Sequence, residues 1–482
     1  MAHRPLRGHD LAQRNVLMRP LPAADYDVVV AGGGNAGLCA AIIAAEAGAR
    51  VLLAERATEA SRSGNTRHTR NIRDSHPAAD GFVSGPYPED EFLADLESVT
   101  GVKNGELARL VIAESVSLAS WMHGHGVAWQ PPLRGTLGLS RTNHFFLGGG
   151  KALANAYYRE LRRLGVEVRY ETSVIDVVLD GGTCLGVVLA LRDGARVTVP
   201  CRALVVAAGG FEANLDWLAE YWGPRAKGFV VRGTPHNDGT LLRVLLDRGA
   251  RAVGDPKGVH AIAVDARGPS VDGGIVTRLD TIPLGIVVDR NGRRFYDEGE
   301  DLWPKRYAIW GRLIAERPGQ LAYSIVDGPA LERVIAPLYP PIEARSIDEL
   351  AERIGVDRAA LRKTIDAFGR AVVPGHYDPD RLDSCRTEGI SPPKSHWARR
   401  LEAPPYFCFP LRPGITFTYM GVMVDRDARV QWHGEPVSNI YAAGEVVSGN
   451  ILPTGYLAGL GLTIGSAFGR IAGRQAARHA RT

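Results

Sequence analysis

The chain has 482 residues, 45% of them hydrophobic and 23% charged, and a formal net charge of +4, so we expect a globular protein of two domains that does not bind nucleic acid. Its five cysteines are scattered without a CxxC pair, which argues against disulfides, zinc ribbons and iron–sulfur clusters and indicates a reducing compartment. No run of 18 apolar residues is present, so we expect no membrane-spanning helix and no direct membrane insertion.

The first predicted element is an N-terminal arm over residues 1–24. It contains basic residues, but no apolar stretch follows them, so the arm does not have the pattern of a secretory signal. Together with the scattered cysteines, this pattern predicts a cytoplasmic protein.

Residues 26–56 are predicted to form a strand, a turn, a helix and a second strand. The apolar run YDVVV precedes Gly32-x-Gly34-x-x-Gly37, and an alanine-rich helix pattern follows. Such glycines let the chain turn tightly and let a pyrophosphate approach the helix N-terminus. The second strand ends at Glu55, where a carboxylate would bind a ribose hydroxyl. The dinucleotide-binding residues predicted from this unit are Gly32, Gly34, Asn35, Ala36, Gly37, Glu55 and Arg56.

Two later strands also run into turns marked by glycine. One is ALVVAAGGFEAN at 203–214, and the other is SNIYAAGEVVSGN at 438–450, which a helix pattern rich in small residues follows. Turns from distant segments suit a large dinucleotide, and the carboxylate of Glu445 is placed to meet the ribityl part of a flavin. This arrangement favours FAD over NAD. The residues predicted here are Ala208, Gly209, Gly210, Gly444, Glu445 and Leu460.

Longer strings carry a resemblance to a known family. They are SRTNHFFLGGGKAL (140–153), RRFYDEGEDLWPKRYAIWGRL (293–313) and RPGITFTYMGV (412–422). From Tyr26 to Ala477 the chain resembles the flavoprotein family of fumarate reductases, succinate dehydrogenases and ketosteroid dehydrogenases, and within it the tricarballylate-oxidising members above all.

The resemblance implies an α/β fold with two domains. A Rossmann-like FAD-binding domain would be made of two segments, 25–245 and 403–482, and an α+β capping domain would be inserted at 246–402. The cap sequence agrees, because 346–372 has the pattern of paired helices, with Ser346 and Asp348 as capping residues.

The resemblance also extends the set of expected FAD contacts. The stretch SGNTRHTRN (63–71) matches the family's flavin-phosphate segment, YETSVIDVV (170–178) its adenine-side strand, and HNDGT its flavin-side turn. Some relatives attach FAD covalently to a histidine at the position of Asn65, so the cofactor here is expected to be non-covalent. The residues carried over are Gly64, Asn65, Thr66, Val174, Asp238 and Gly239.

The expected chemistry removes or adds two hydrogens across a carbon–carbon bond. By resemblance, the cap histidine is His260, the substrate-binding threonine is Thr277, and the proton-transferring arginine is Arg306, with Tyr307 beside it. Arginine suits a carboxylate because its planar fork donates two parallel hydrogen bonds.

Three positions depart from the family pattern. Arg278 replaces an acid, Phe417 a histidine and Tyr456 an arginine. The last two lost groups hold a substrate carboxylate in fumarate reductases, which weakens the case for fumarate or succinate. Arg278, with Arg141 and His144, would rebuild a cationic pocket, whereas Tyr419 and Tyr456 would serve a less charged substrate.

The sequence therefore predicts an FAD-dependent dehydrogenase of a small polycarboxylate, with tricarballylate to cis-aconitate as the leading case. The alternatives are a same-family reductase or desaturase of a ketosteroid or biosynthetic intermediate, and a flavin-binding relay protein without a substrate. By resemblance, a separate membrane-associated iron–sulfur or haem protein would accept the electrons. No metal-ligand spacing is present, so no metal is expected.

Overall fold

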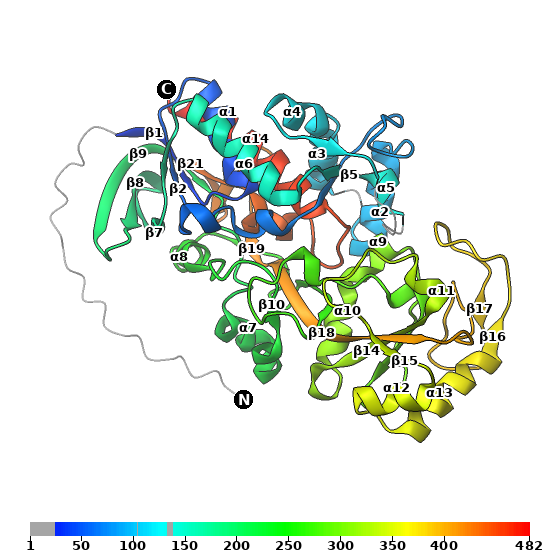
Figure 1. Ribbon diagram of the computed structural model, residues 1–482. Coiled ribbons are helices and arrows are strands. Elements are labelled where there is room, and N and C mark those ends of the chain that lie inside the picture. The colour runs from blue at the N-terminus through cyan, green and yellow to red at the C-terminus, as the bar shows by residue number, and fades with distance from the viewer. Residues whose placement is uncertain (1–24, 104, 133–137) are drawn as a thin grey trace.

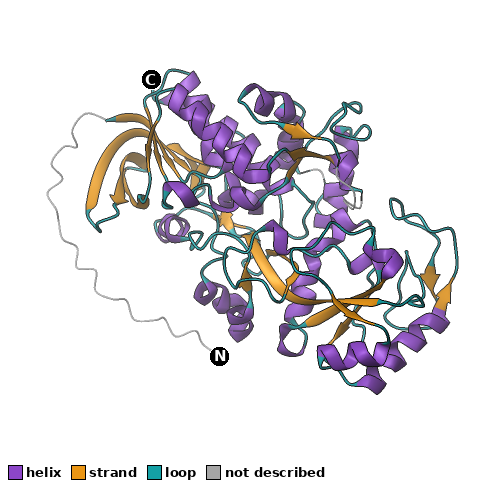
Figure 2. Cartoon of the chain, in the orientation of Figure 1, coloured by secondary structure: helices purple, strands orange, loops and turns teal. Residues whose placement is uncertain are grey.

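The computed structural model describes residues 25–103, 105–132 and 138–482 (Figure 1). The arm predicted at 1–24 lies outside these residues. Across the described part of the chain, helices and strands divide between two lobes that each contain a large sheet (Figure 2). Among the described helices, none combines the length and apolar character that a membrane crossing requires.

The first lobe is built on an eight-stranded sheet. Its strands run in the order β20-β21-β9-β1-β2-β6, and β8 joins β9 to β7. The pairings of β1 with β2 and β9, and of β9 with β21, are parallel, and they align Ala31, Val206 and Ala442. The three glycine turns predicted from the sequence therefore meet at one edge of the sheet, as parallel strands require. The bounds are β1 Tyr26–Ala31, β2 Val51–Ala54, β6 Glu167–Arg169, β7 Ser173–Asp180, β8 Thr183–Ala190, β9 Arg196–Val206, β20 Arg429–Trp432 and β21 Glu435–Ala442.

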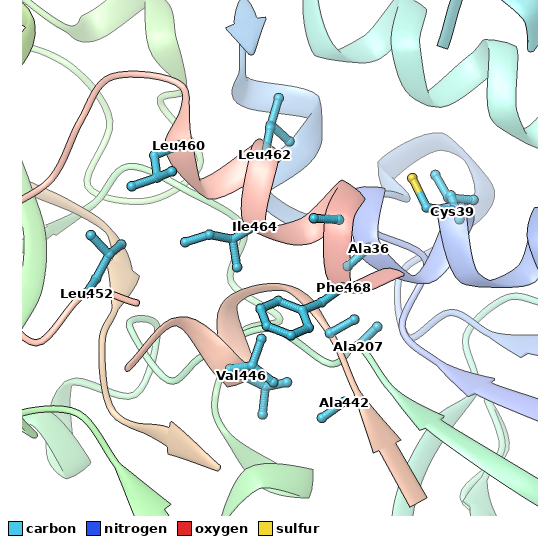
Figure 3. Packing of buried hydrophobic residues seen from close by; sticks show 14 of the residues in the cluster. Ala36, Cys39, Ala207, Ala442, Val446, Leu452, Leu460, Leu462, Ile464 and Phe468 are labelled. Atoms are coloured by element: carbon cyan, nitrogen blue, oxygen red, sulfur yellow. The ribbon is translucent and has the colours of Figure 1, made fainter. Parts of the chain in front are cut away.

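Helices α1 (Asn35–Glu46) and α14 (Leu460–His479) pack tightly against one another in this lobe. A Cβ atom added at Gly469 would lie 2.5 Å from the carbonyl oxygen of Ala36, and one added at Gly473 would lie 2.4 Å from that of Ala40. Glycine at every fourth position of α14 thus lets the two backbones approach. Figure 3 shows residues of both helices in the buried cluster.

The second lobe is built on a six-stranded sheet with β18 at its centre. Strand β18 pairs with β10, β12, β14 and β15, and β14 pairs with β13. Two helices, α12 and α13, belong to this lobe (Figure 1). The bounds are β10 Val230–Val231, β12 Val259–Asp265, β13 Ile286–Asp289, β14 Ala322–Asp327, β15 Ile342–Ala344, β18 Tyr406–Thr418, α12 Ile347–Ile354 and α13 Arg358–Ala371.

The helix pair of the cap begins at two polar residues. Ser346 Oγ accepts a hydrogen bond from the Glu349 amide (3.2 Å), as expected for an N-cap. The second helix is capped by Asp357, whose Oδ1 accepts from the Ala360 amide (2.7 Å). Asp348, expected to cap, instead pairs with Arg362.

Strand β18 links the two lobes, as the orange ribbon in Figure 1 shows. The cap sheet therefore includes β10 and β18, which lie outside the 246–402 segment. The remaining strands are β3 Asn71–Arg73, β4 Trp129–Gln130, β5 Asn143–Phe146, β11 Ala252–Val253, β16 Val372–Val373, β17 Arg386–Thr387 and β19 Gly421–Val422. The remaining helices are α2 Glu89–Thr100, α3 Glu106–Ser115, α4 Leu118–Gly124, α5 Leu139–Thr142, α6 Gly149–Arg163, α7 Leu215–Trp222, α8 Thr240–Asp247, α9 Trp303–Arg306, α10 Trp310–Ala315 and α11 Gly328–Leu331.

Candidate active site

A long cavity runs from the carboxyl ends of β1, β9 and β21 to the end of β18. It encloses roughly 1600 Å³ of space, its opening to solvent included. Its walls come from both lobes, because Gly32 and Glu55 line one part while His260 and Thr416 line another. The cavity therefore joins a dinucleotide-type site to a second site at the cap.

The glycine turn after β1 forms the first wall. Gly32 has a φ of +107°, and a Cβ there would lie 2.3 Å from the carbonyl oxygen of Ala207. A Cβ on Gly33 would meet the Tyr158 hydroxyl and the Glu55 carboxylate at 2.2 and 2.6 Å. The first residues of α1 follow directly, so this helix presents its N-terminus to the cavity, as pyrophosphate binding requires. The residues present thus fit a dinucleotide.

Most residues predicted to hold the cofactor lie on the cavity wall. They are Gly32, Gly34, Asn35, Ala36, Glu55, Arg56, Gly64, Asn65, Thr66, Val174, Ala208, Gly209, Asp238, Gly444 and Glu445.

Four predicted cofactor residues do not line the cavity, because they pack against other parts of the protein. Gly37 faces the carbonyl oxygen of Gly32, and Gly210 leaves room for the Glu445 carboxylate. Gly239 packs against the Trp217 ring and the Cβ atom of Phe211. Leu460 is buried in the hydrophobic cluster, while the wall at this point is formed by the neighbouring Gly461 and Leu462.

At the expected ribose end, Glu55 is 5% exposed and accepts hydrogen bonds from the amides of Ala57 (2.8 Å) and Ser63 (3.1 Å). Burial raises the pKa of this carboxyl group, and the two amides oppose that effect. Beside it, Arg56 and Asp238 form an ion pair of 2.7 Å. The ion pair connects the loops that follow β2 and precede α8.

Both polar atoms of the Asn65 side-chain amide form hydrogen bonds. Its Nδ2 donates to Glu212 Oε1 (2.5 Å) and to the carbonyl oxygen of Thr416 (2.8 Å), and its Oδ1 accepts from the Thr234 amide (2.8 Å). Glu212, which the sequence analysis did not select, is fully buried, and Asn237 Nδ2 also donates to it (2.8 Å). These bonds fix four separate segments around the cavity.

The seven residues predicted to act in catalysis divide into two groups. His260, Arg278, Tyr307 and Tyr456 line the cavity. Thr277, Arg306 and Tyr419 do not.

Local contacts hold the side chains of Thr277, Arg306 and Tyr419 outside the cavity wall. This corrects the expectation that they would lie in the site. Arg306 pairs with Glu300 (3.1 Å). Thr277 Oγ1 donates to the carbonyl oxygen of Gly274 (2.9 Å). The Tyr419 side chain packs edge-on against Phe417, which itself forms part of the wall.

A chain of hydrogen bonds crosses the cap end of the cavity. Arg232 Nη2 donates to Thr416 Oγ1 (2.8 Å), which lies 3.0 Å from His260 Nδ1, and His260 Nε2 lies 3.0 Å from Tyr307 Oη. Burial, and then the charges of Arg232 and Arg278, hold the pKa of His260 well below its usual value. His260 is therefore neutral near pH 7.

Three arginines line this end of the cavity. Arg278 Nε donates to Asp280 Oδ1 (2.6 Å), and Arg70 Nη2 donates to Asp280 Oδ2 (3.2 Å). The Arg278 guanidinium also lies 3.9 Å from the centre of the Tyr307 ring, a cation–π contact. One carboxylate thus serves two guanidinium groups.

Arg232 has no carboxylate partner among the described residues. It is 6% exposed, and its Nε and Nη1 make no hydrogen bond in the described part of the chain. Burial, and then the charge of Arg278, lowers its pKa to about 10, so it stays charged near pH 7. Sequence reasoning missed Arg70 and Arg232, and the only signal was their type, which is uninformative in an arginine-rich chain.

Arg141 and His144, expected to help build a cationic pocket, lie elsewhere. Arg141 pairs with Glu91, and His144 is held between Asp74 (2.8 Å) and Asp80 (3.0 Å). Both carboxylates raise the pKa of His144 against the effect of burial. Ligand atoms of Asp74, His144 and His76 lie within 4.8 Å of one another, a grouping that the sequence spacing did not reveal.

Comparison with known proteins identifies the family. The profile of the FAD binding domain matches residues 27–462, and the chain therefore belongs to this family.

Curated relatives define the class of chemistry. The chain is 28% identical over 475 residues to NADH:fumarate oxidoreductase of Klebsiella pneumoniae, covering 95% of this chain and 48% of that protein. It is 26% identical over 503 residues to a fumarate reductase (cytochrome) of Shewanella frigidimarina, covering 98% and 80%. It thus spans about half the length of the Klebsiella protein. These matches confirm the resemblance to fumarate reductase flavoproteins, FAD-dependent oxidoreductases that act on CH–CH bonds.

Solved structures confirm the α/β FAD-binding fold. The open conformation of a flavocytochrome c3 fumarate reductase superposes with a TM-score of 0.74 at 22% identity, covering 96% of this chain and 79% of that one. A 3-ketosteroid-Δ4-(5α)-dehydrogenase from Rhodococcus jostii superposes with a TM-score of 0.71 at 23% identity, covering 95% and 98%.

Proposed function

We propose that this flavoprotein dehydrogenates a small polycarboxylate at the carbon–carbon bond next to a carboxylate, with tricarballylate to cis-aconitate as the leading case. When bound, FAD supplies the oxidant that accepts the hydride. The protein must bind the carboxylates, exclude water and move one proton.

The observation that carries the proposal is the unpaired, buried Arg232. A charge held out of water without a counter-ion costs several kcal/mol. A substrate carboxylate would offset that cost by accepting from the free Nε and Nη1. Arg70 and Arg278, which share Asp280, form a second cationic centre, so the cavity offers two places for carboxylates. An uncharged steroid would leave the Arg232 charge without a counter-ion.

Spectroscopy under anaerobic conditions tests the substrate. Tricarballylate is expected to bleach the yellow protein, because two-electron reduction removes the flavin's visible absorbance. Succinate, which has one carboxylate fewer, is expected to bleach it more slowly, and 4-androstene-3,17-dione not at all. Bleaching by the steroid alone would instead support the less charged alternative, and no bleaching by any compound would support a relay protein.

A second expected result is that FAD is bound without a covalent bond. Asn65, whose amide is fully engaged in hydrogen bonds, offers no nucleophile for attachment. His68, which also lines the cavity, is held through Nε2 by Asp272 (2.5 Å). Acid precipitation should therefore release all of the yellow colour into the supernatant. Colour retained in the protein pellet would show a covalent linkage, and mass spectrometry of the peptide containing 64–70 would locate it.

The reduced flavin also needs an acceptor. We propose a separate membrane-associated iron–sulfur or haem protein, since the five cysteines of this chain lack the spacing of a cluster site.

A further inference from the structure

We propose that Tyr307, not Arg306, is the residue that exchanges the proton with substrate, and that Thr416 and His260 position its hydroxyl for this task. This inference rests on the proposed function, and it assigns a catalytic residue within the same site. It follows from the placement of side chains at the cap end of the cavity.

The first step concerns access. Tyr307 lines the cavity, whereas Arg306 does not and forms an ion pair with Glu300. A group that transfers a proton must lie within hydrogen-bond reach of the substrate atom concerned. Of the two neighbours, only Tyr307 lines the cavity and can therefore meet this condition.

The second step concerns the direction of the hydrogen bonds. Arg232 can only donate, so Thr416 Oγ1 accepts from it and is free to donate its own hydrogen to His260 Nδ1. A neutral His260 then carries its proton on Nε2 and donates to Tyr307 Oη. The hydrogen-bond chain therefore places an N–H donor against the tyrosine oxygen, which stabilises a phenolate.

The third step concerns charge. The Arg278 guanidinium lies 3.9 Å from the centre of the Tyr307 ring, so negative charge on the phenolate has a cation beside it. The charged and titratable groups around this tyrosine are His260 on β12, Arg278 and Asp280 before β13, Arg232 after β10, Arg70 before β3, Tyr419 after β18, and Tyr456 before α14. Four of these seven are bases, and Asp280 is the single carboxylate.

The reaction then balances as follows. The Tyr307 phenolate takes a proton from the carbon next to the carboxylate, and the electron pair of that C–H bond becomes the second bond of the new double bond. FAD, when bound in the part of the cavity lined by Gly32 and Glu55, would supply the two-electron oxidant that takes the hydride from the neighbouring carbon, which leaves an unsaturated acid. The phenol gives up its proton to water after the product leaves.

The ionisation of Tyr307 predicts a pH profile. Burial raises the pKa of this phenol, and the nearby arginines oppose the effect. The dehydrogenation rate should therefore rise with pH at a slope of about one logarithm per unit between about pH 6 and 9, because only the phenolate acts as a base. His260, with its pKa well below normal, and Arg232, with a pKa of about 10, do not titrate in this interval.

The test uses stopped-flow reduction of the FAD-loaded protein by tricarballylate. Tyr307→Phe removes one oxygen and keeps the ring beneath Arg278. We expect it to retain FAD and to bind the acid within about threefold, measured by perturbation of the flavin spectrum, while reduction slows about 100-fold or more and loses its pH dependence. Arg306→Lys is the matched control and should reduce its flavin at close to the parent rate.

The positioning role is tested with Thr416. Thr416→Val removes the hydroxyl that sets the His260 tautomer, so we expect slower reduction, whereas Thr416→Ser restores it. Parent-rate reduction by Tyr307→Phe, or a 100-fold loss in Arg306→Lys alone, would overturn the proposal and leave the proposed function standing. A parent protein that no acid reduces would overturn both.

Discussion

Gly37→Ala is expected to produce a protein that does not retain FAD. A Cβ at this position would lie 1.9 Å from the carbonyl oxygen of Gly32, which is backbone and cannot rotate away. Helix α1 would have to move from β1 and carry its N-terminus away from the expected pyrophosphate position. Alanine is the better helix former by about 1 kcal/mol, so lost helix propensity cannot explain the defect. The ratio of flavin to protein absorbance after gel filtration measures the result.

Gly369→Ala is the matched control. Gly369 also lies inside a helix, α13, but a Cβ there would meet no atom within 4 Å. This variant should keep full FAD and gain about 0.5–1 kcal/mol of stability, the usual benefit of replacing a helical glycine. Full FAD occupancy in Gly37→Ala would contradict the geometry of the turn.

Arg232→Met is expected to weaken tricarballylate binding about 30- to 1000-fold, which corresponds to about 2–4 kcal/mol for the loss of a buried charge-assisted contact. Methionine fills much of the same space without the charge. FAD retention should not change. Thermal stability of the free protein should stay equal or increase, because an unpaired buried cation is removed. Spectral titration with the acid and thermal unfolding with and without it provide the two measurements.

The two readouts separate a substrate-binding arginine from a structural one. If Arg232 only stabilised the fold, its removal would lower the unfolding temperature and leave acid binding intact. Arg306→Met, which removes an arginine that does not line the cavity, should change the affinity by no more than about threefold.

The glycine turns were predictable because their signal is local. The pattern Gly32-x-Gly34-x-x-Gly37 lies between a strand and a helix in the sequence, and the register of the parallel sheet then brings Ala31, Val206 and Ala442 level. The two-domain α/β fold, by contrast, was implied by the resemblance to the family and not by these patterns alone.

The cap end was less predictable because its residues come from separate segments. Arg70, Arg232 and Thr416 line the same cavity only after β3, β10 and β18 have assembled. No spacing in the sequence predicts that they lie together. The sequence could not show which of Arg306 and Tyr307 lines the cavity, and the reason is different. Consecutive residues of a helical turn point about 100° apart, so one of the two faces the cavity, and only the three-dimensional contacts say which.

The glycine contact between α1 and α14 has a consequence for biosynthesis. Residues 35–46 and 460–479 lie at opposite ends of the described chain, yet α14 supplies Gly461, Leu462 and Gly465 to the cavity wall. During translation the ribosome delivers α1 first, at roughly 5–20 residues per second, so this helix waits on the order of half a minute for its partner. Until α14 emerges, the nascent chain has an incomplete cofactor site and an uncovered apolar face on α1. Over that interval the apolar face of α1 is open to chaperones or to aggregation.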